Sequence, residues 1–192
     1  MKTIILASAS PRRKEILERT RLKFEVDESR CEERPGHGMK PHETAMFLSR
    51  EKARDVAGRH TNSIVIAADT VVVLEGRLFG KPASKEDARK MLKALSGKAH
   101  SVITAFTILD TDNGKKVSAS VETKVFFKKL GKDEIEAYIS SGEPFGKAGA
   151  YGIQGLGAVM VKKIEGDFFN VMGLPLNALA ESLKKFGVKI LG

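Results

Sequence analysis

The sequence has no tryptophan, two tyrosines and a single cysteine among its 192 residues. With so few Trp and Tyr side chains, there is little material for the aromatic platforms on which single-stranded nucleic acids stack. The lone Cys31 cannot form a disulfide within the chain, so we expect a reducing, cytoplasmic location. These shortages argue against a disulfide-stabilised exported protein.

Long apolar runs are also missing. No stretch approaches the roughly 20 apolar residues that a membrane-spanning helix needs, so we expect no membrane partner. Near the N-terminus, the run Ile4-Ile5-Leu6 is shorter than the roughly 7–15 apolar residues of a secretion signal. The serines, proline and arginines that follow this run therefore need another explanation.

Positive charge is in excess. The chain has 33 Lys and Arg against 24 Asp and Glu, a formal net charge of +9. Such an excess favours a polyanionic partner, either nucleic acid or a small phosphorylated molecule. Charge alone leaves that choice open, although basic residues scattered along the chain argue against a nucleic-acid-binding stripe.

Hydrophobic patterns predict strands that alternate with helices. We expect strands at 3–7, 24–26, 64–74, 77–79, 102–109 and 117–127, with Asn113-Gly114 as a hairpin turn. Helices are expected after Ser10, at 43–56, after Ser84, at 133–140 and at 176–186. A last hairpin is predicted from strands at 158–164 and 168–172. The class is α/β, with a large mixed sheet flanked by helices.

The stretch Ser8-Ala9-Ser10-Pro11 joins a strand to a helix. Backbone N–H groups and hydroxyls at a helix N-terminus favour an anion. Arg12 and Arg13 oppose the helix dipole there unless a phosphate lies in front of them. The alternative is that Ser10 merely caps the helix and both arginines are solvated; the residues alone leave the two interpretations even.

Asp69 is anomalous because it interrupts the most apolar strand of the chain, IVIAADTVVVL. A buried carboxylate needs a cation or a metal beside it, which favours a functional role over a turn-capping one. Glu32 and Glu33 lie in a charged loop and would be read as solvated surface by themselves. Beside Asp69, one of them could complete a Mg²⁺ site that also uses substrate phosphates.

Three further polar side chains are candidates on weaker grounds. Lys52 lies on a helix where a surface role is the default, and Lys81 stands in a rigid Gly-Lys-Pro turn that points its ammonium outward. Gln154 lies in the glycine-rich stretch GKAGAYGIQGLG, where glycines allow a ligand to approach the backbone. A glutamine there could read the edge of a base, because it both donates and accepts hydrogen bonds.

Six motifs together resemble the Maf family of nucleotide pyrophosphatases, in the expected order over nearly the whole chain: LASASPRRKEIL, IAADTVV, FGKP, LSGKAHSVITA, KAGAYGIQG and VMGLP. The resemblance implies hydrolysis of nucleoside triphosphates to the monophosphate and pyrophosphate, with a divalent metal cation, Mg²⁺ or Mn²⁺. It implies one domain, 1–192, with an inosine-triphosphatase-like fold: an elongated mixed sheet in two lobes with a central cleft. It also implies house-cleaning of nucleotide pools and a link to cell division arrest.

The resemblance also implies residue roles. Asp69 matches the general base, and Asp69 with Glu33 the metal region. Arg12, Thr70 and Gln154 match the positions tied to substrate choice. Ser8, Arg13, Lys52 and Lys81 match the phosphate-handling set. Ser10 is counted among the substrate-binding residues, and Lys81 and Glu33 are counted among the catalytic residues. The combination of SPRR and ADT resembles the subgroup acting on dTTP and UTP.

Other classes of function remain open at this stage. They are a pyrophosphatase for methylated GTP or damaged purine nucleotides, a nucleic-acid-binding regulator of septum formation, and a nucleotide sensor without turnover. The intact Asp69 argues against the sensor. A nucleoside triphosphate is the expected partner, and a homodimer is left open.

Overall fold

A computed structural model describes residues 2–32, 34–36 and 38–191. A seven-stranded mixed sheet has the order β2-β1-β3-β5-β6-β7, with β4 paired to β3. The strands are β1 Thr3–Leu6, β2 Glu25–Val26, β3 Ser63–Leu74, β4 Arg77–Phe79, β5 Ala99–Asp110, β6 Lys116–Phe127 and β7 Val161–Glu165. The helices are α1 Pro11–Glu18, α2 Pro41–Ala57, α3 Lys85–Leu95, α4 Lys132–Ser140, α5 Phe168–Met172 and α6 Leu176–Lys184, with short 3₁₀ turns η1 Ala148–Ala150 and η2 Gly155–Met160. The predicted α/β class is confirmed.

The chain divides into two compact units. Unit 1 contains Met1–Asp69, Thr104–Val121 and Gly173–Gly192, and unit 2 contains Thr70–Ile103 and Glu122–Met172. The strands β3, β5 and β6 each contribute residues to both. Within the described ranges, no helix combines the length and apolar character needed to cross a membrane.

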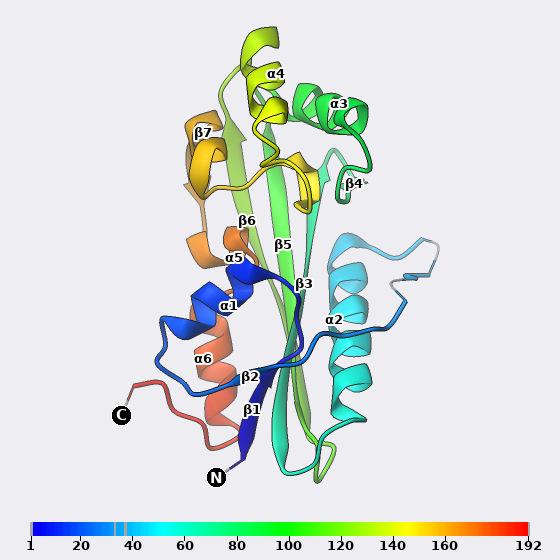
Figure 1. Cartoon of the computed structure of the whole chain (residues 1–192), viewed down its shortest axis with the longest axis vertical. Helices are drawn as coiled ribbons and strands as arrows, with labels where there is room; N and C mark the ends of the chain where they lie inside the picture. The colour runs from blue at the N-terminus through cyan, green and yellow to red at the C-terminus, as the bar shows by residue number, and fades with distance from the viewer. Residues whose placement is uncertain (1, 33, 37, 192) are drawn as a thin grey trace. The chain divides into compact units, whose positions relative to one another are not determined.

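Unit 1 is built around a parallel strand pair. β1 pairs with β3 in the register Ile4↔Ile64 to Leu6↔Ile66, and Ile5 and Val65 pack with Ala53 and Val56 of α2. Small side chains at Ala53 and Ala67 let α2 approach the strands closely. Figure 1 shows α2 on one side of β1 and β3, and α1 and α6 on the other.

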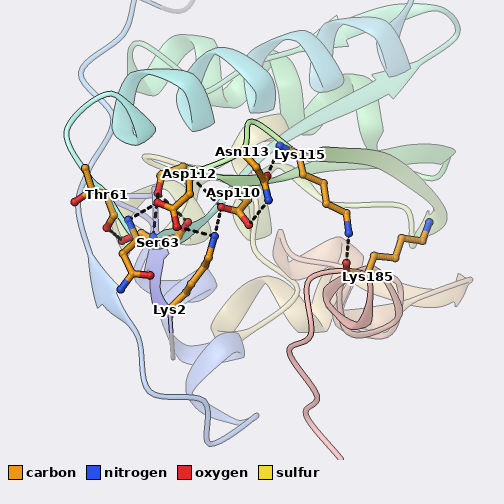
Figure 2. A network of polar contacts seen from close by, with 10 residues as sticks. Lys2, Thr61, Ser63, Asp110, Asp112, Asn113, Lys115 and Lys185 are labelled. Atoms are coloured by element: carbon orange, nitrogen blue, oxygen red, sulfur yellow. Dashed lines mark hydrogen bonds and ion pairs between the residues drawn. The ribbon is translucent and has the colours of Figure 1, made fainter.

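A polar network ties the start of unit 1 to the β5–β6 turn (Figure 2). The Lys2 ammonium bonds to Asp110 and lies 2.9 Å from Asp112 Oδ2, which lowers the pKa of the Asp110 carboxyl. Lys115 donates to the backbone carbonyl of Lys185, beyond α6. The network therefore joins Lys2, just before β1, and Lys185, just after α6, to the same β5–β6 turn.

Unit 2 has its own apolar core. Leu92 and Leu95 of α3 meet Ile135 and Ile139 of α4 over Val102 of β5, and α3 and α4 lie side by side (Figure 1). Ser84 caps α3 by accepting a hydrogen bond from Asp87 N at 3.1 Å, as the sequence predicts. The Glu75-Gly76 turn between β3 and β4 has both residues at positive φ, which matches a tight hairpin turn.

The predicted last hairpin is wrong. Residues 158–160 belong to the η2 turn, and Phe168–Met172 forms the helix α5 instead of a strand. Asp167 Oδ1 accepts hydrogen bonds from Phe169 N at 2.7 Å and Asn170 N at 3.2 Å, which caps that helix. The buried Asn170 amide donates to Val102 O and to Thr123 Oγ1. The spacing of apolar residues in the sequence does not predict these contacts.

His100 is buried within unit 2. Its Nε2 lies 2.7 Å from the Tyr151 hydroxyl, and its ring meets Phe127 and Tyr151 edge to face. Its Nδ1 has no hydrogen-bond partner among the described atoms. Burial lowers the pKa of His100 to about 4, so the folded protein holds this ring neutral.

We expect His100 to make stability depend on pH. The unfolded chain takes up a proton below about pH 6.5, whereas the folded chain takes it up only near pH 4. Stability is therefore lost as pH falls through this window, by about 2 kcal/mol between pH 7 and pH 5. Urea unfolding at pH 7 and at pH 5 should show a smaller loss of unfolding free energy in His100→Gln than in the wild type, by about 2 kcal/mol, because glutamine does not titrate. An equal loss in both proteins would contradict the assignment.

Candidate active site

The first group of candidate residues lies at one end of the parallel β1–β3 pair. Leu6 pairs with Ile66 at the end of the β1–β3 register. Ser8 lies two residues after Leu6, and Asp69 lies three residues after Ile66. The carboxyl ends of parallel strands are where α/β proteins bind ligands. The Ala7 N–H donates to Ile66 O at 2.8 Å and extends the strand pairing to the edge of this group.

Asp69 is paired with Lys52 of α2. Lys52 Nζ donates to Asp69 Oδ1 at 2.6 Å, and the side chains are only 12% and 11% exposed. The default surface role for Lys52 is therefore wrong, and the buried carboxylate has the cation that its burial requires. The pair places a carboxylate and a cation side by side just beyond the last β1–β3 pairing.

Arg13 is anchored at both ends of its guanidinium. Its Nε donates to Gly173 O at 2.8 Å, and its Nη1 donates to the buried Ser8 Oγ at 3.2 Å. Ser8 Oγ also accepts from Ser10 N at 3.2 Å, and Arg12 is half-buried in the same turn. The second interpretation, in which both arginines are merely solvated, does not describe Arg13.

Ser10 does not cap α1 with its side chain. It occupies the N-cap position with Pro11 next, as predicted, but its hydroxyl makes no capping hydrogen bond. Pro11 has no N–H, so the helix starts with one donor fewer to satisfy. The first turn of α1 carries two arginines and no acidic residue, which favours an anion in front of it.

The second group of candidate residues belongs to unit 2. Thr70 is half-buried in β3, Lys81 is exposed after β4, and Gln154 is half-buried before η2. Gly80 O accepts a hydrogen bond from Gly149 N at 3.0 Å, so the turn bearing Lys81 is tied to the segment that leads to Gln154. The structure thus brings two separate sequence motifs of this unit together.

Two residues of unit 2 that the sequence did not single out hold the segment around Gln154. The Tyr138 hydroxyl accepts from Gly152 N at 3.1 Å, and the Glu143 carboxylate accepts from Leu156 N and Gly157 N at 2.9 and 3.0 Å. No sequence pattern linked α4 to the glycine-rich stretch. The glycines themselves were the available signal, because they mark close backbone approach.

The predicted metal region is described only in part. Glu33 lies outside the described residues. Within the described ranges, no three or more His, Cys, Asp or Glu side chains gather as a metal-binding group. Mg²⁺ usually takes one or two carboxylates together with substrate phosphates, and the Asp69 carboxylate has the hard oxygen donors that such a cation prefers. The donor chemistry of Asp69 therefore fits the implied cation.

The family model described as Maf-like protein matches residues 3–186. A dTTP/UTP pyrophosphatase of Methanosarcina barkeri is 52% identical over 191 residues, covering 99% of this chain and 97% of the relative. Another dTTP/UTP pyrophosphatase, from Pelotomaculum thermopropionicum, is 47% identical and covers 100% of both chains.

A solved structure, the Ham1 protein of Staphylococcus aureus, superposes on 66% of this chain and 72% of its own, with a TM-score of 0.44 and 17% identity. A likeness of that degree carries no argument about function. The fold is mixed α/β, and a buried Lys52–Asp69 ion pair lies just beyond the last β1–β3 pairing. The family match and the relatives make the rest specific: the chain belongs to the Maf family.

Proposed function

We propose that this protein hydrolyses dTTP and UTP to the nucleoside monophosphate and pyrophosphate. The observation that carries the proposal is identity of 45–52% along nearly the whole chain to relatives named dTTP/UTP pyrophosphatase. The geometry of the candidate residues supports it, because cations, hydroxyls and one buried carboxylate suit transfer at phosphorus. The whole chain, 1–192, acts as one catalytic domain that clears nucleotide pools in the cytoplasm.

The residues of unit 1 are assigned to the triphosphate. Asp69 orients the attacking water and accepts its proton, while Lys52 at 2.6 Å fixes the direction of the carboxylate. Arg13, held by Ser8 and the Gly173 carbonyl, presents a preoriented guanidinium to a phosphate. Ser8, Ser10 and the N-terminus of α1 add hydroxyl and N–H donors for the same anion.

A divalent cation, Mg²⁺ or Mn²⁺, would neutralise the triphosphate and ease the departure of pyrophosphate. Asp69 and Glu33 are the residues that would hold it. Lys81, exposed on its turn in unit 2, is assigned to the charge of the leaving pyrophosphate.

Arg12, Thr70 and Gln154 are assigned to the base. Uracil and thymine present carbonyl acceptors and one ring N–H, and a glutamine amide can pair with both kinds of group. Thr70 is short and leaves room beside the strand. A methylated guanine carries a positive charge, which an aromatic side chain would meet better than Arg12 does.

A triphosphate panel tests the proposal. With pyrophosphate release as the readout, dTTP and UTP should be hydrolysed well, and ATP, GTP and methylated GTP poorly. A preference for methylated GTP would support the second candidate function, a pyrophosphatase for modified purine nucleotides, and would contradict the assigned base site.

We expect Gln154→Ala to lower the UTP-to-GTP ratio of kcat/KM at least about tenfold, because a site built around hydrogen bonds rejects bases that leave them unmade. UTP and GTP share the ribose and the triphosphate, so the ratio isolates the base. Full selectivity in the variant would show that Gln154 does not read the base.

A further inference from the structure

The loop that carries Gln154 is fastened on both of its sides by one pair of side chains. On its N-terminal side, Gly152 N donates to the Tyr138 hydroxyl at 3.1 Å. On its C-terminal side, Leu156 N and Gly157 N donate to the two oxygens of Glu143 at 2.9 and 3.0 Å. The Tyr138 hydroxyl in turn donates to Glu143 Oε1 at 2.9 Å, which closes the arrangement. We call Tyr138 and Glu143 the clamp, and residues 152–157 the base loop.

Two glycines of the base loop, Gly155 and Gly157, are explained by this clamp. A Cβ at Gly155, which has φ +73°, would lie 2.7 Å from Glu143 Oε2. A Cβ at Gly157 would lie 2.8 Å from the Tyr138 hydroxyl and 2.2 Å from Gly152 O. The sequence suggested that glycines here open the backbone to a ligand, whereas the nearest neighbours of a Cβ at Gly155 and Gly157 are the clamp and the loop itself.

The Glu143 carboxylate is suited to this task in its charged form. Burial raises its pKa, but hydrogen bonds from Gly157, Leu156 and Tyr138 outweigh burial and lower it overall. An ionised carboxylate can accept hydrogen bonds at both oxygens, which an amide cannot do. Charge-assisted bonds of this kind are also stronger than neutral ones.

We propose that Tyr138 and Glu143 are positioning residues for base selection, which hold the base loop so that Gln154 presents its amide in one orientation. The inference rests on the proposed function of Gln154. A glutamine amide selects a base only when its orientation is held, because its oxygen and nitrogen ends are alike in shape and opposite in hydrogen bonding. The clamp reaches the loop two residues before Gln154 and two and three residues after it.

Glu143→Gln is the sharpest test, because it keeps the shape of the side chain. Its single carbonyl oxygen can serve only one of the two backbone donors, and its NH₂ group faces the other. We expect kcat/KM for UTP to fall about 10- to 100-fold, with a smaller loss for GTP, so that the UTP-to-GTP ratio collapses. Tyr138→Phe, which removes both hydroxyl bonds, should change the ratio in the same direction.

Glu134→Gln is the matched control. Glu134 lies on α4, the helix that carries Tyr138, and like Glu143 it accepts a backbone N–H, here from Gly131 at 2.8 Å. It lies in the first turn of that helix, whereas Tyr138 lies near its end. A loss of stability alone lowers the active fraction equally for every substrate and leaves the ratio unchanged. We therefore expect Glu134→Gln to keep the wild-type ratio, whatever its melting temperature.

A double-mutant cycle separates the clamp from other effects. If the clamp acts through Gln154, Glu143→Gln should change the UTP-to-GTP ratio no further once Gln154→Ala is present. Additive changes, or an unchanged ratio in Glu143→Gln, would overturn the clamp while leaving the proposed function intact. A wild-type protein that releases no pyrophosphate from UTP would overturn the proposed function and, with it, this inference.

Discussion

Asp69→Asn should reduce dTTP turnover by about 10³-fold or more, since a positioned base commonly contributes between 10² and 10⁴. The substitution keeps the shape of the side chain and removes the charge that accepts a proton from water. It also leaves Lys52, which lies 2.6 Å from Asp69 Oδ1 and is 12% exposed, without its anionic partner. Steady-state kinetics with dTTP, normalised to the folded fraction measured by circular dichroism, gives the result.

Asp110→Asn is the matched control for Asp69→Asn. Asp110 is also a buried carboxylate of unit 1 in an ion pair with a lysine, Lys2, and it has no assigned role in the reaction. Both variants remove the charge of a buried carboxylate that is paired with a lysine, which is destabilising. We expect Asp110→Asn to keep turnover per folded molecule. Near-wild-type turnover in Asp69→Asn, or an equal loss in both variants, would contradict the role of Asp69.

Removal of divalent cations should abolish activity on dTTP and UTP. The substrate is highly anionic, and a divalent cation is the group proposed to neutralise its charge. EDTA treatment followed by gel filtration should leave no measurable pyrophosphate release, and added Mg²⁺ or Mn²⁺ should restore it.

A measurement of folding separates a cation needed for chemistry from one needed for folding. Circular dichroism of the metal-free protein should match that of the untreated protein, because Lys52 already balances the Asp69 charge without a cation. Full turnover in a verified metal-free sample would contradict the assigned cation role.

Much of the fold could be predicted, because local sequence determines it. The Asn113-Gly114 turn lies between β5 and β6, and the apolar run from Ile64, interrupted by Asp69, is the long strand β3. The start of α2 could be placed only approximately, at 43 instead of Pro41. Lys40 N donates to the Glu43 carboxylate at 2.9 Å, and with this capping contact the helix begins two residues earlier, at Pro41.

The helix α5 could not be predicted from the local sequence pattern. Phe168–Met172 is rich in apolar residues and resembles a short strand. It forms a helix that Asp167 caps locally and that the buried Asn170 anchors through Val102 O and Thr123 Oγ1. Short apolar segments are ambiguous between strand and helix until tertiary contacts are known.

The candidate site was predictable in its residue types but not in its pairings. An aspartate inside an apolar strand indicated a partner, yet nothing in the sequence identified that partner as Lys52, 17 residues earlier. No sequence pattern indicated a role for Glu143 and Tyr138, since that role depends on where α4 ends relative to the base loop. Pairings of this kind come from the fold as a whole.

Product analysis in ¹⁸O-labelled water tests the central claim most directly. Wild-type protein, dTTP and Mg²⁺ should yield dTMP that carries the label together with unlabelled pyrophosphate, because water attacks the α-phosphorus. Mass spectrometry of both products distinguishes the routes in one reaction. Labelled orthophosphate with dTDP, label in pyrophosphate instead of dTMP, or no turnover of dTTP would contradict the account.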